Sequence, residues 1–377
     1  MRWFLVFSLY FLVLASCHAQ TTPAPPPRLQ VGANEMLMCM RRHLDLTVCN
    51  YAGIVSDGNS IAVVANQTSM VGNTHLVDTL LAREANVVKI FCPEHGFRGT
   101  AEAGAQVDNS TDPKTGLPII SLYGKNKKPT QEQLSDVAVV IFDLQDVGCR
   151  FYTYLSTLHY VMEACAERGI PLIVLDRPNP NGHYIDGPVL DTANYRSFVG
   201  MHPVPIVYGM TIGEYAQMIN GEGWLSNGMK CDLHVAPMRG YCRDSVYTLS
   251  VPPSPNLRNT HAIALYPSLC LFEGTTCGVG RGTPTPFEIV TYGKDTLNLT
   301  AFDPSDSCMH LDFLQNMYKR VPKGKFFLKN NFFDRLAGTD QLRRQIIQGK
   351  SEEEIRASWQ PAIEHFKTIR SRYLIYP

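Results

Sequence analysis

Four short apolar runs alternate with helix-like stretches in the first half of the chain, and this alternation restricts the fold more than any other feature. The runs span residues 61–65, 87–92, 137–142 and 171–175, and helix patterns span 74–84 and 152–168. Gly169 follows the second helix pattern, where a left-handed residue commonly ends a helix. Unbroken apolar strands that alternate with helices indicate a parallel sheet with helices on both faces. We therefore predict an α/β fold with a Rossmann-like sheet.

Polar and ionisable residues follow each of these four runs. They are Asn66 after the first run, Glu94 and His95 after the second, Asp143, Gln145 and Asp146 after the third, and Asp176 and Arg177 after the fourth. The carboxyl ends of parallel strands meet at one edge of the sheet, where α/β proteins bind their ligands. Taken alone, Asp143 or Asp176 is equally acceptable as a helix cap. Taken together, the four sets predict a functional site at this edge.

The start of the chain has the pattern of an export signal. Arg2 precedes an apolar stretch, residues 3–15, that is too short to span a bilayer, and small residues follow at 17–19. We expect a signal peptide over residues 1–19, a proline-rich linker over 20–33 and a secreted protein. The sequence LASC (14–17) also fits a lipobox, so a periplasmic lipoprotein anchored through Cys17 is the alternative.

The rest of the chain, about 350 residues, exceeds what one hydrophobic core usually holds. We predict a Rossmann-like catalytic domain over residues 34–228 and a smaller α+β auxiliary domain over 229–377. The chain has 34 Lys and Arg against 34 Asp and Glu and no basic tract, so we expect no nucleic-acid partner. No later apolar run has the length of a membrane span, so we expect no stable membrane insertion. The sequence does not indicate an oligomeric state.

Cysteine spacing permits disulfides in an exported chain. The pairs closest in sequence are Cys39 with Cys49, Cys231 with Cys242, and Cys270 with Cys277. The chain contains neither CxxC nor HExxH, which argues against a zinc ribbon and a zinc protease. We therefore predict no metal site.

Motifs for cofactors and for a serine nucleophile are also missing. No GxGxxG follows the first strand, and the glycine-rich segment 278–283 lacks the third glycine. The Gly-Lys-Ser at 349–351 has Arg344 where the first glycine of a phosphate-binding loop belongs. GxSxG is absent. We expect no cofactor.

What remains is a carboxylate site with aromatic neighbours. Glu94 stands beside His95, and Asp146 is followed by Arg150 and Tyr152. Aromatic rings pack against sugars while charged groups bond hydroxyls, so this set suits a polar, ring-shaped substrate. Glycoside hydrolysis needs a carboxylic acid that protonates the departing oxygen, and we assign this role to Glu94. His95 and Asp146 are the other candidate catalytic residues.

Long motifs then make the sequence recognisable. They are PEHGFRG (93–99), TGLPIISLYG (115–124), FDLQDVGCRFYTY (142–154), VLDRPNPNG (174–182), GMTIGEYA (209–216), PPSPN (252–256), LFEGTTCGVGRGTPTPFE (271–288) and FDRLAGTD (333–340). The chain resembles the NamZ family of exo-β-N-acetylmuramidases from about residue 61 to its end. The resemblance implies a Rossmann-like catalytic domain, an auxiliary C-terminal domain and a cleft between them. It also implies release of N-acetylmuramic acid from the non-reducing end of peptidoglycan fragments without a cofactor.

The resemblance assigns roles to particular residues. Glu94 matches the glutamate proposed in the family as acid/base, and Arg98 lies in the same motif. A planar guanidinium can grip a carboxylate with two bonds, so Arg150 and Arg281 are candidates to bind the lactyl group of muramic acid. Asp143, Asp146 or the substrate's own acetamido group could act as nucleophile.

A second hypothesis is a catalytically weak sugar-binding protein that retains the cleft. It rests on the segment 288–333, which is shorter than is usual in the family. The long connection 97–129 is expected to form a lid over the site.

Overall fold

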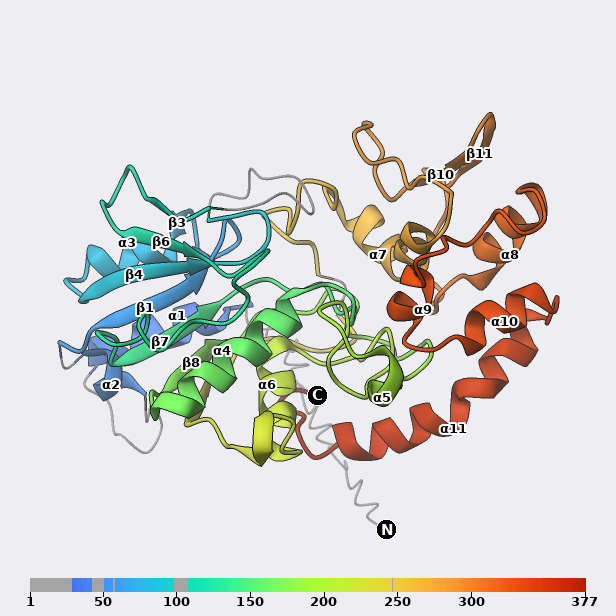
Figure 1. Cartoon of the computed structure of the whole chain (residues 1–377). Helices are drawn as coiled ribbons and strands as arrows, with labels where there is room; N and C mark the ends of the chain where they lie inside the picture. The colour runs from blue at the N-terminus through green and yellow to red at the C-terminus, as the bar shows by residue number, and fades with distance from the viewer. Residues whose placement is uncertain (1–28, 43–50, 57, 98–107, 246) are drawn as a thin grey trace, which may run out of the picture.

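The computed structural model describes residues 29–42, 51–56, 58–97, 108–245 and 247–377 (Figure 1). It contains one seven-stranded sheet in the order β5-β6-β4-β1-β7-β8-β9. The strands are β1 (Ile61–Ala65), β4 (Val87–Cys92), β5 (Ser110–Thr111), β6 (Pro118–Ser121), β7 (Val139–Asp143), β8 (Leu172–Leu175) and β9 (Leu233–Ala236). All neighbours are parallel except β5 and β6. The predicted Rossmann-like parallel sheet is confirmed.

The central strands are buried on both faces because successive side chains point in opposite directions. In β1, Ala62 and Val64 belong to one hydrophobic cluster, whereas Ile61 and Val63 belong to another. The first cluster includes helices α4 (Tyr154–Arg168) and α6 (Ile212–Gly221). The second includes α1 (Gly32–Arg42), α2 (Ala52–Ser56) and α3 (Leu76–Leu81). The unbroken apolar runs of the sequence therefore reflect a sheet covered by helices on both sides.

Local capping signals mark the ends of helices, and Gly169 does so where the sequence predicts. Gly169 follows α4 with a left-handed φ of 62°. Helix α11 (Glu352–Arg370) begins with a capping box of Ser351 and Glu354, in which each side chain accepts from the other residue's backbone N–H. Thr130 and Gln133 exchange the same two bonds, at 2.9 and 3.2 Å, although a turn and not a helix follows them. Capping chemistry here closes a turn.

The connection after β4 is more ordered than a lid. Its described part contains β5 and β6, and Ile119 and Ile120 of β6 pair with β4. These strands extend the sheet on one side, and residues 98–107 lie outside the described residues. The expectation of a long lid over residues 97–129 is therefore corrected for its second half.

The C-terminal domain contains helices and one small antiparallel sheet. Its elements are α7 (Thr260–Leu269), the 3-10 helix η2 (Cys270–Gly274), strands β10 (Ile289–Tyr292) and β11 (Asp295–Asn298), and helices α8 (Leu311–Arg320), α9 (Phe332–Ala337), α10 (Gln341–Ile347) and α11. The remaining elements of the described residues are short: β2 (Met70–Val71), β3 (Thr74–His75), α5 (Thr192–Tyr195) and the 3-10 helix η1 (Ser226–Gly228). The predicted smaller α+β domain is confirmed.

The two domains share a core. The hydrophobic cluster on the α4 side of the sheet continues through Phe272, Phe313 and Phe366 of the C-terminal domain. Helix α11 then leads back toward the sheet, and the chain ends near α6 (Figure 1). Strand β9 lies beyond the boundary predicted at residue 228, so the sheet contains more of the chain than the sequence pattern suggests.

Most cysteines are free thiols. Cys231, Cys242, Cys270 and Cys277 form no disulfide, which corrects two of the three expected pairs. Cys39 is disulfide-bonded, and Cys49 lies outside the described residues. The signal peptide, most of the linker and the lipobox also lie outside them. Within the described residues, no helix has the length and apolar character needed to cross a membrane.

Candidate active site

The Pro-Glu-His-Gly turn lies directly after β4, at the carboxyl edge of the sheet. Gly96 N–H donates to Pro93 O at 3.1 Å and closes the turn. His95 has a φ of 73°, which is uncommon for a residue with a side chain. Such conformations persist where the surroundings impose them, and they cluster at functional sites. The turn leaves His95 buried and Glu94 partly exposed.

Hydroxyl groups surround the Glu94 carboxylate. Thr153, the residue before α4, donates to Glu94 Oε2 at 3.0 Å. Tyr123 hydrogen-bonds the same carboxylate, and burial followed by the Glu94 charge raises the pKa of this phenol above its usual range. Both partners are hydrogen-bond donors that keep their protons at neutral pH. Two neutral hydroxyl groups of the sheet domain therefore help to hold the carboxylate in position.

A cavity of about 350 Å³ lies between the two domains and includes this carboxylate. Its described lining includes Glu94, His95 and Tyr152 from the sheet domain and Tyr266, Glu273 and Arg281 from the C-terminal domain. Polar and aromatic side chains from both domains converge on one half-open cavity. This matches the general form of a small-molecule site.

Aromatic rings form one wall of the cavity. The Tyr152 ring lies 4.7 Å from that of Tyr154 and 6.1 Å from that of Tyr266, measured between centroids. Tyr266 continues the wall to Phe151 at 5.4 Å and Phe287 at 5.0 Å. All four contacts are edge-to-face, the arrangement that aromatic rings prefer over a flat sandwich. The wall is therefore a packed, rigid surface.

Glu273 is a second carboxylate on the cavity, and the sequence analysis missed it. Arg281 donates from Nε to Glu273 Oε1 at 2.6 Å, and its Nη2 lies 2.5 Å from the same oxygen. The guanidinium lies 5.0 Å from the centroid of the Phe287 ring. Burial alone would lower the pKa of Arg281, but the charge and the hydrogen bond of Glu273, with smaller contributions from Tyr266 and Cys270, together raise it above its usual value. The missed signal was the motif LFEGTT, which contains Glu273 on η2. Glu273 follows no strand of the sheet, so the expectation that site residues lie at the carboxyl ends of strands could not identify it.

Asp143 and Arg177 bind each other away from the cavity. Arg177 donates from Nε and Nη2 to the two Asp143 oxygens at 2.6 and 2.8 Å. Asp143 is fully buried, and neither residue lines the cavity in the part of the chain that the structure describes. As expected for residues that follow neighbouring strands, the two side chains lie together, but they form a buried ion pair. A nucleophilic role for Asp143 has no support in this arrangement.

Asp146 and Gln145 lie in the packed interior. Asp146 Oδ2 accepts from the Tyr208 hydroxyl and from Gly148 N–H, whereas Oδ1 has no hydrogen-bond partner. Burial raises the Asp146 pKa to about 7, although the Tyr208 and Gly148 bonds oppose it. Gln145 Nε2 donates to the carbonyls of Asp146 and Pro178 at 2.8 and 2.6 Å. Neither is among the described residues that line the cavity.

Asp176 anchors the end of the chain. Its Oδ2 accepts from Thr211 at 2.7 Å and from the Tyr376 hydroxyl at 2.6 Å. Its Oδ1 accepts from Gly213 N–H at the start of α6, at 2.8 Å. Burial raises the Asp176 pKa to about 6. The helix-cap alternative is therefore the better description of Asp176.

Arg150 is a structural residue, which corrects the expectation that it binds a substrate carboxylate. It is 1% exposed and bonds four backbone carbonyls. Nη1 donates to Pro188 and Val204, and Nη2 donates to Leu336 and Ala337 of α9, all at 2.7–2.9 Å. A guanidinium engaged in this way cannot reach a ligand. It joins the two domains instead.

Two predicted residues remain. Asn66 is fully buried and donates from Nδ2 to the Tyr154 hydroxyl at 2.8 Å, so it supports the aromatic wall from behind. Arg98 lies outside the described residues. The structure thus brings Glu94, His95, Tyr152 and Arg281 together on one cavity.

Comparisons with known proteins agree on the family. Residues 61–261 match the N-terminal domain of the exo-β-N-acetylmuramidase NamZ, and residues 264–302 and 295–376 match its C-terminal domain. The chain is 35% identical to the peptidoglycan β-N-acetylmuramidase NamZ of Bacillus subtilis (strain 168), over 99% of this chain and 97% of that protein.

Solved structures of similar fold come from Bacteroides fragilis NCTC 9343. One DUF1343 family protein has a TM-score of 0.81 and 41% identity, and the match covers 92% of this chain and 99% of its own. Another has a TM-score of 0.80 and 28% identity, covering 94% and 100%. Both domains of the chain are therefore present in these relatives.

Proposed function

Because the chain belongs to the NamZ family of exo-β-N-acetylmuramidases, we propose that it releases N-acetylmuramic acid from the non-reducing end of peptidoglycan fragments, with Glu94 as general acid. The full-length match to a named peptidoglycan β-N-acetylmuramidase supports the glycosidase class. The cavity between the domains supports the assignment of individual residues.

The position of Glu94 is the single observation that carries this proposal. Its carboxylate lines the cavity, with hydroxyl donors and an aromatic wall around it. A general acid must lie within hydrogen-bond reach of the oxygen that it protonates. A substrate glycosidic oxygen in this cavity can meet that condition at Glu94. Asp143 and Asp176 are engaged elsewhere, in an ion pair and in a cap.

The shape of the cavity favours a terminal sugar. About 350 Å³ is near the lower end of the range for small-ligand pockets. Tyr152 and Tyr266 offer ring surfaces for the apolar face of a pyranose, and nearby polar groups suit its hydroxyls. A long glycan would need an open groove instead. This supports exo-type cleavage.

Glu273 supplies the second carboxylate of the mechanism. Its ion pair with Arg281 holds this carboxylate in place, and we assign the role of proton donor to Glu94 alone. Glycoside cleavage develops positive charge on the sugar ring, and a fixed negative group in a partly dry cavity stabilises that charge. The substrate's acetamido group remains the alternative to a carboxylate nucleophile.

Arg281 gives a basis for recognising muramic acid. Arg281 donates from Nε to Glu273 and places Nη2 beside the same oxygen, whereas Nη1 makes no hydrogen bond within the described residues. A lactyl carboxylate can therefore bind at Nη1 without breaking the pair with Glu273.

A secreted or lipid-anchored location fits a peptidoglycan substrate and remains part of the proposal.

Turnover of a chromogenic β-N-acetylmuramide tests the function. We expect purified protein to release the chromophore and to leave the matching β-N-acetylglucosaminide largely intact. A muramic-acid disaccharide should yield the free sugar from its non-reducing end. Tight sugar binding without release would instead support the sugar-binding protein considered above.

A further inference from the structure

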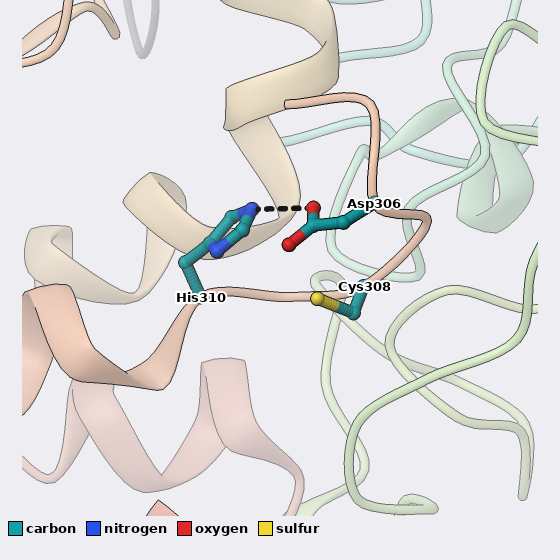
Figure 2. Close-up of side chains that lie close together, drawn as sticks. All are labelled: Asp306, Cys308 and His310. Atoms are coloured by element: carbon teal, nitrogen blue, oxygen red, sulfur yellow. Dashed lines mark ion pairs between the residues drawn. The ribbon is translucent and has the colours of Figure 1, made fainter. Parts of the chain in front are cut away.

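We propose that Asp306, Cys308 and His310 bind a divalent transition-metal ion, with Zn²⁺ the best match. The three residues alternate along the segment that leads into α8, and their ligand atoms all lie within 4.8 Å of one another. Figure 2 shows the three side chains pointing toward a common space. The sequence rules for zinc sites search for paired cysteines or histidines on a helix, so they miss this spacing.

The side chains of His310 and Asp306 approach each other without forming a hydrogen bond. His310 is 9% exposed, and its Nε2 has no hydrogen-bond partner among the described residues. Asp306 Oδ1 nevertheless lies only 3.1 Å from this nitrogen (Figure 2). The two atoms are close but not aligned as donor and acceptor. That is the arrangement expected when both face one shared ion.

Neighbouring groups hold the His310 imidazole in place. The His310 ring packs against Phe313 at 5.0 Å and against Phe302 at 4.7 Å, between centroids. The backbone N–H of His310 donates to Ser268 Oγ at 2.8 Å. Ser307, between the first two ligands, has a left-handed φ of 55°. The imidazole orientation is therefore fixed before any ion binds.

The donor set selects the class of ion. A thiolate, an imidazole and a carboxylate together suit Zn²⁺ and similar ions, whereas Ca²⁺ and Mg²⁺ require oxygen ligands. Zn²⁺ is usually four-coordinate, so a water molecule completes the shell. The Cys308 thiol gives its proton to solvent on binding, because the thiolate is the ligand. The positive charge of the ion balances the negative charge of the thiolate that this deprotonation leaves.

The site lies where the two domains meet and apart from the cavity of Glu94. Met309, between two of the ligands, donates from N–H to Asp186 Oδ2 of the sheet domain at 2.8 Å. Arg356 of α11 binds the same Asp186 oxygen at 2.5 Å and also the Met309 carbonyl. The three ligands do not line the cavity of Glu94 in the described part of the chain. An ion here stabilises the segment where the two domains meet.

Cobalt spectroscopy on the full chain tests the site. The untagged protein is stripped with a chelator, freed of it and titrated with Co²⁺ alone. We expect one equivalent per chain and a near-ultraviolet sulfur-to-cobalt charge-transfer band that added Zn²⁺ removes. Cys308→Ala should lose the band and bind at least about 100-fold more weakly, since losing even an outer-shell partner costs 10–100-fold.

The control is Cys242→Ala, which removes an exposed free thiol elsewhere and should keep the band. Zn²⁺ should raise the Tm of the wild type and of Cys242→Ala but not that of Cys308→Ala. Asp306→Asn serves as a second ligand variant if Cys308→Ala does not fold. A wild type without the band, or a band that survives in the ligand variant, overturns the proposal.

Discussion

Arg281 and Glu273 form an ion pair of 2.5–2.6 Å on the wall of the cavity that also contains Glu94. Both residues belong to the C-terminal domain, whereas Glu94 follows a strand of the sheet. Glu94 and Glu273 therefore differ in their described neighbours, which include two hydroxyl donors for Glu94 and a guanidinium for Glu273. Different environments are what separate the roles of paired carboxylates in glycosidases.

Glu273→Gln should lower kcat strongly and leave KM almost unchanged. Removing one fixed electrostatic partner of a transition state typically costs about 10²–10³ in kcat. Steady-state kinetics on the muramic-acid disaccharide measure the effect. Glu353→Gln, on the exposed side of α11, is the control and should behave as wild type. A Glu273→Gln enzyme with wild-type kcat would remove Glu273 from the mechanism.

Arg281→Lys should reduce the preference for the muramide over the glucosaminide. Lysine keeps the charge but loses the planar fork, so the lactyl carboxylate is gripped less well. We expect the ratio of the two kcat/KM values to fall by about 10-fold, equivalent to roughly 1.4 kcal/mol. Arg258→Lys, outside the described cavity lining, is the matched control. An unchanged ratio would mean that Arg281 only pairs with Glu273 and does not bind the lactyl carboxylate.

Arg150→Met should destabilise the protein without changing substrate preference. The change leaves four buried carbonyls without their donor, each worth about 1–3 kcal/mol when unsatisfied. We expect the Tm to fall by roughly 5 °C or more. The exposed Arg196→Met provides the comparison and should stay near wild type. A lost preference with an unchanged Tm would restore Arg150 as a substrate ligand.

Asp146→Asn should become more stable relative to wild type as the pH rises from 4 to 8. The folded-state pKa of Asp146 is about 7, above the unfolded value near 3.9. Between these values the folded protein holds a proton that the unfolded chain has lost, so wild-type stability falls with rising pH. The asparagine variant has no such loss, which can reach about 4 kcal/mol.

Denaturant unfolding of both proteins at pH 4, 6 and 8 gives this difference directly. Activity is the second readout for Asp146, because the residue lies outside the described cavity lining. We expect kcat to stay within about 10-fold of wild type, less than the 10²–10⁴ of a general acid. A constant stability difference across the pH range would show that Asp146 ionises normally in the folded protein.

The sequence predicts the sheet well because one local signal repeats. Each of the four apolar runs overlaps a strand, and Gly169 ends α4 as expected. The edge strand β9 lies outside these four runs, and it belongs to the sheet because it pairs with β8. Strand pairing is a long-range property that a local pattern cannot contain.

The same limit explains which site residues were misjudged. From their sequence positions, Asp176 and Arg150 were expected to bind the substrate. Instead, Asp176 accepts a hydrogen bond from Tyr376, and Arg150 donates to carbonyls of α9, so both bind partners that are distant in sequence. Glu273 reaches the cavity only because η2 packs across from the sheet domain. Strand ends predict where a site forms, whereas the partners that fill it come from the second domain.

Glu94→Gln on the natural disaccharide is the most direct test of the central claim. Glutamine keeps the shape and hydrogen bonding of the side chain but cannot deliver a proton. We expect kcat to fall by about 10²–10⁴, with binding little changed. The fall in kcat should be smaller on a nitrophenyl muramide, because its leaving group needs no protonation. Near-wild-type kcat on the disaccharide would contradict the account and move the acid to another residue.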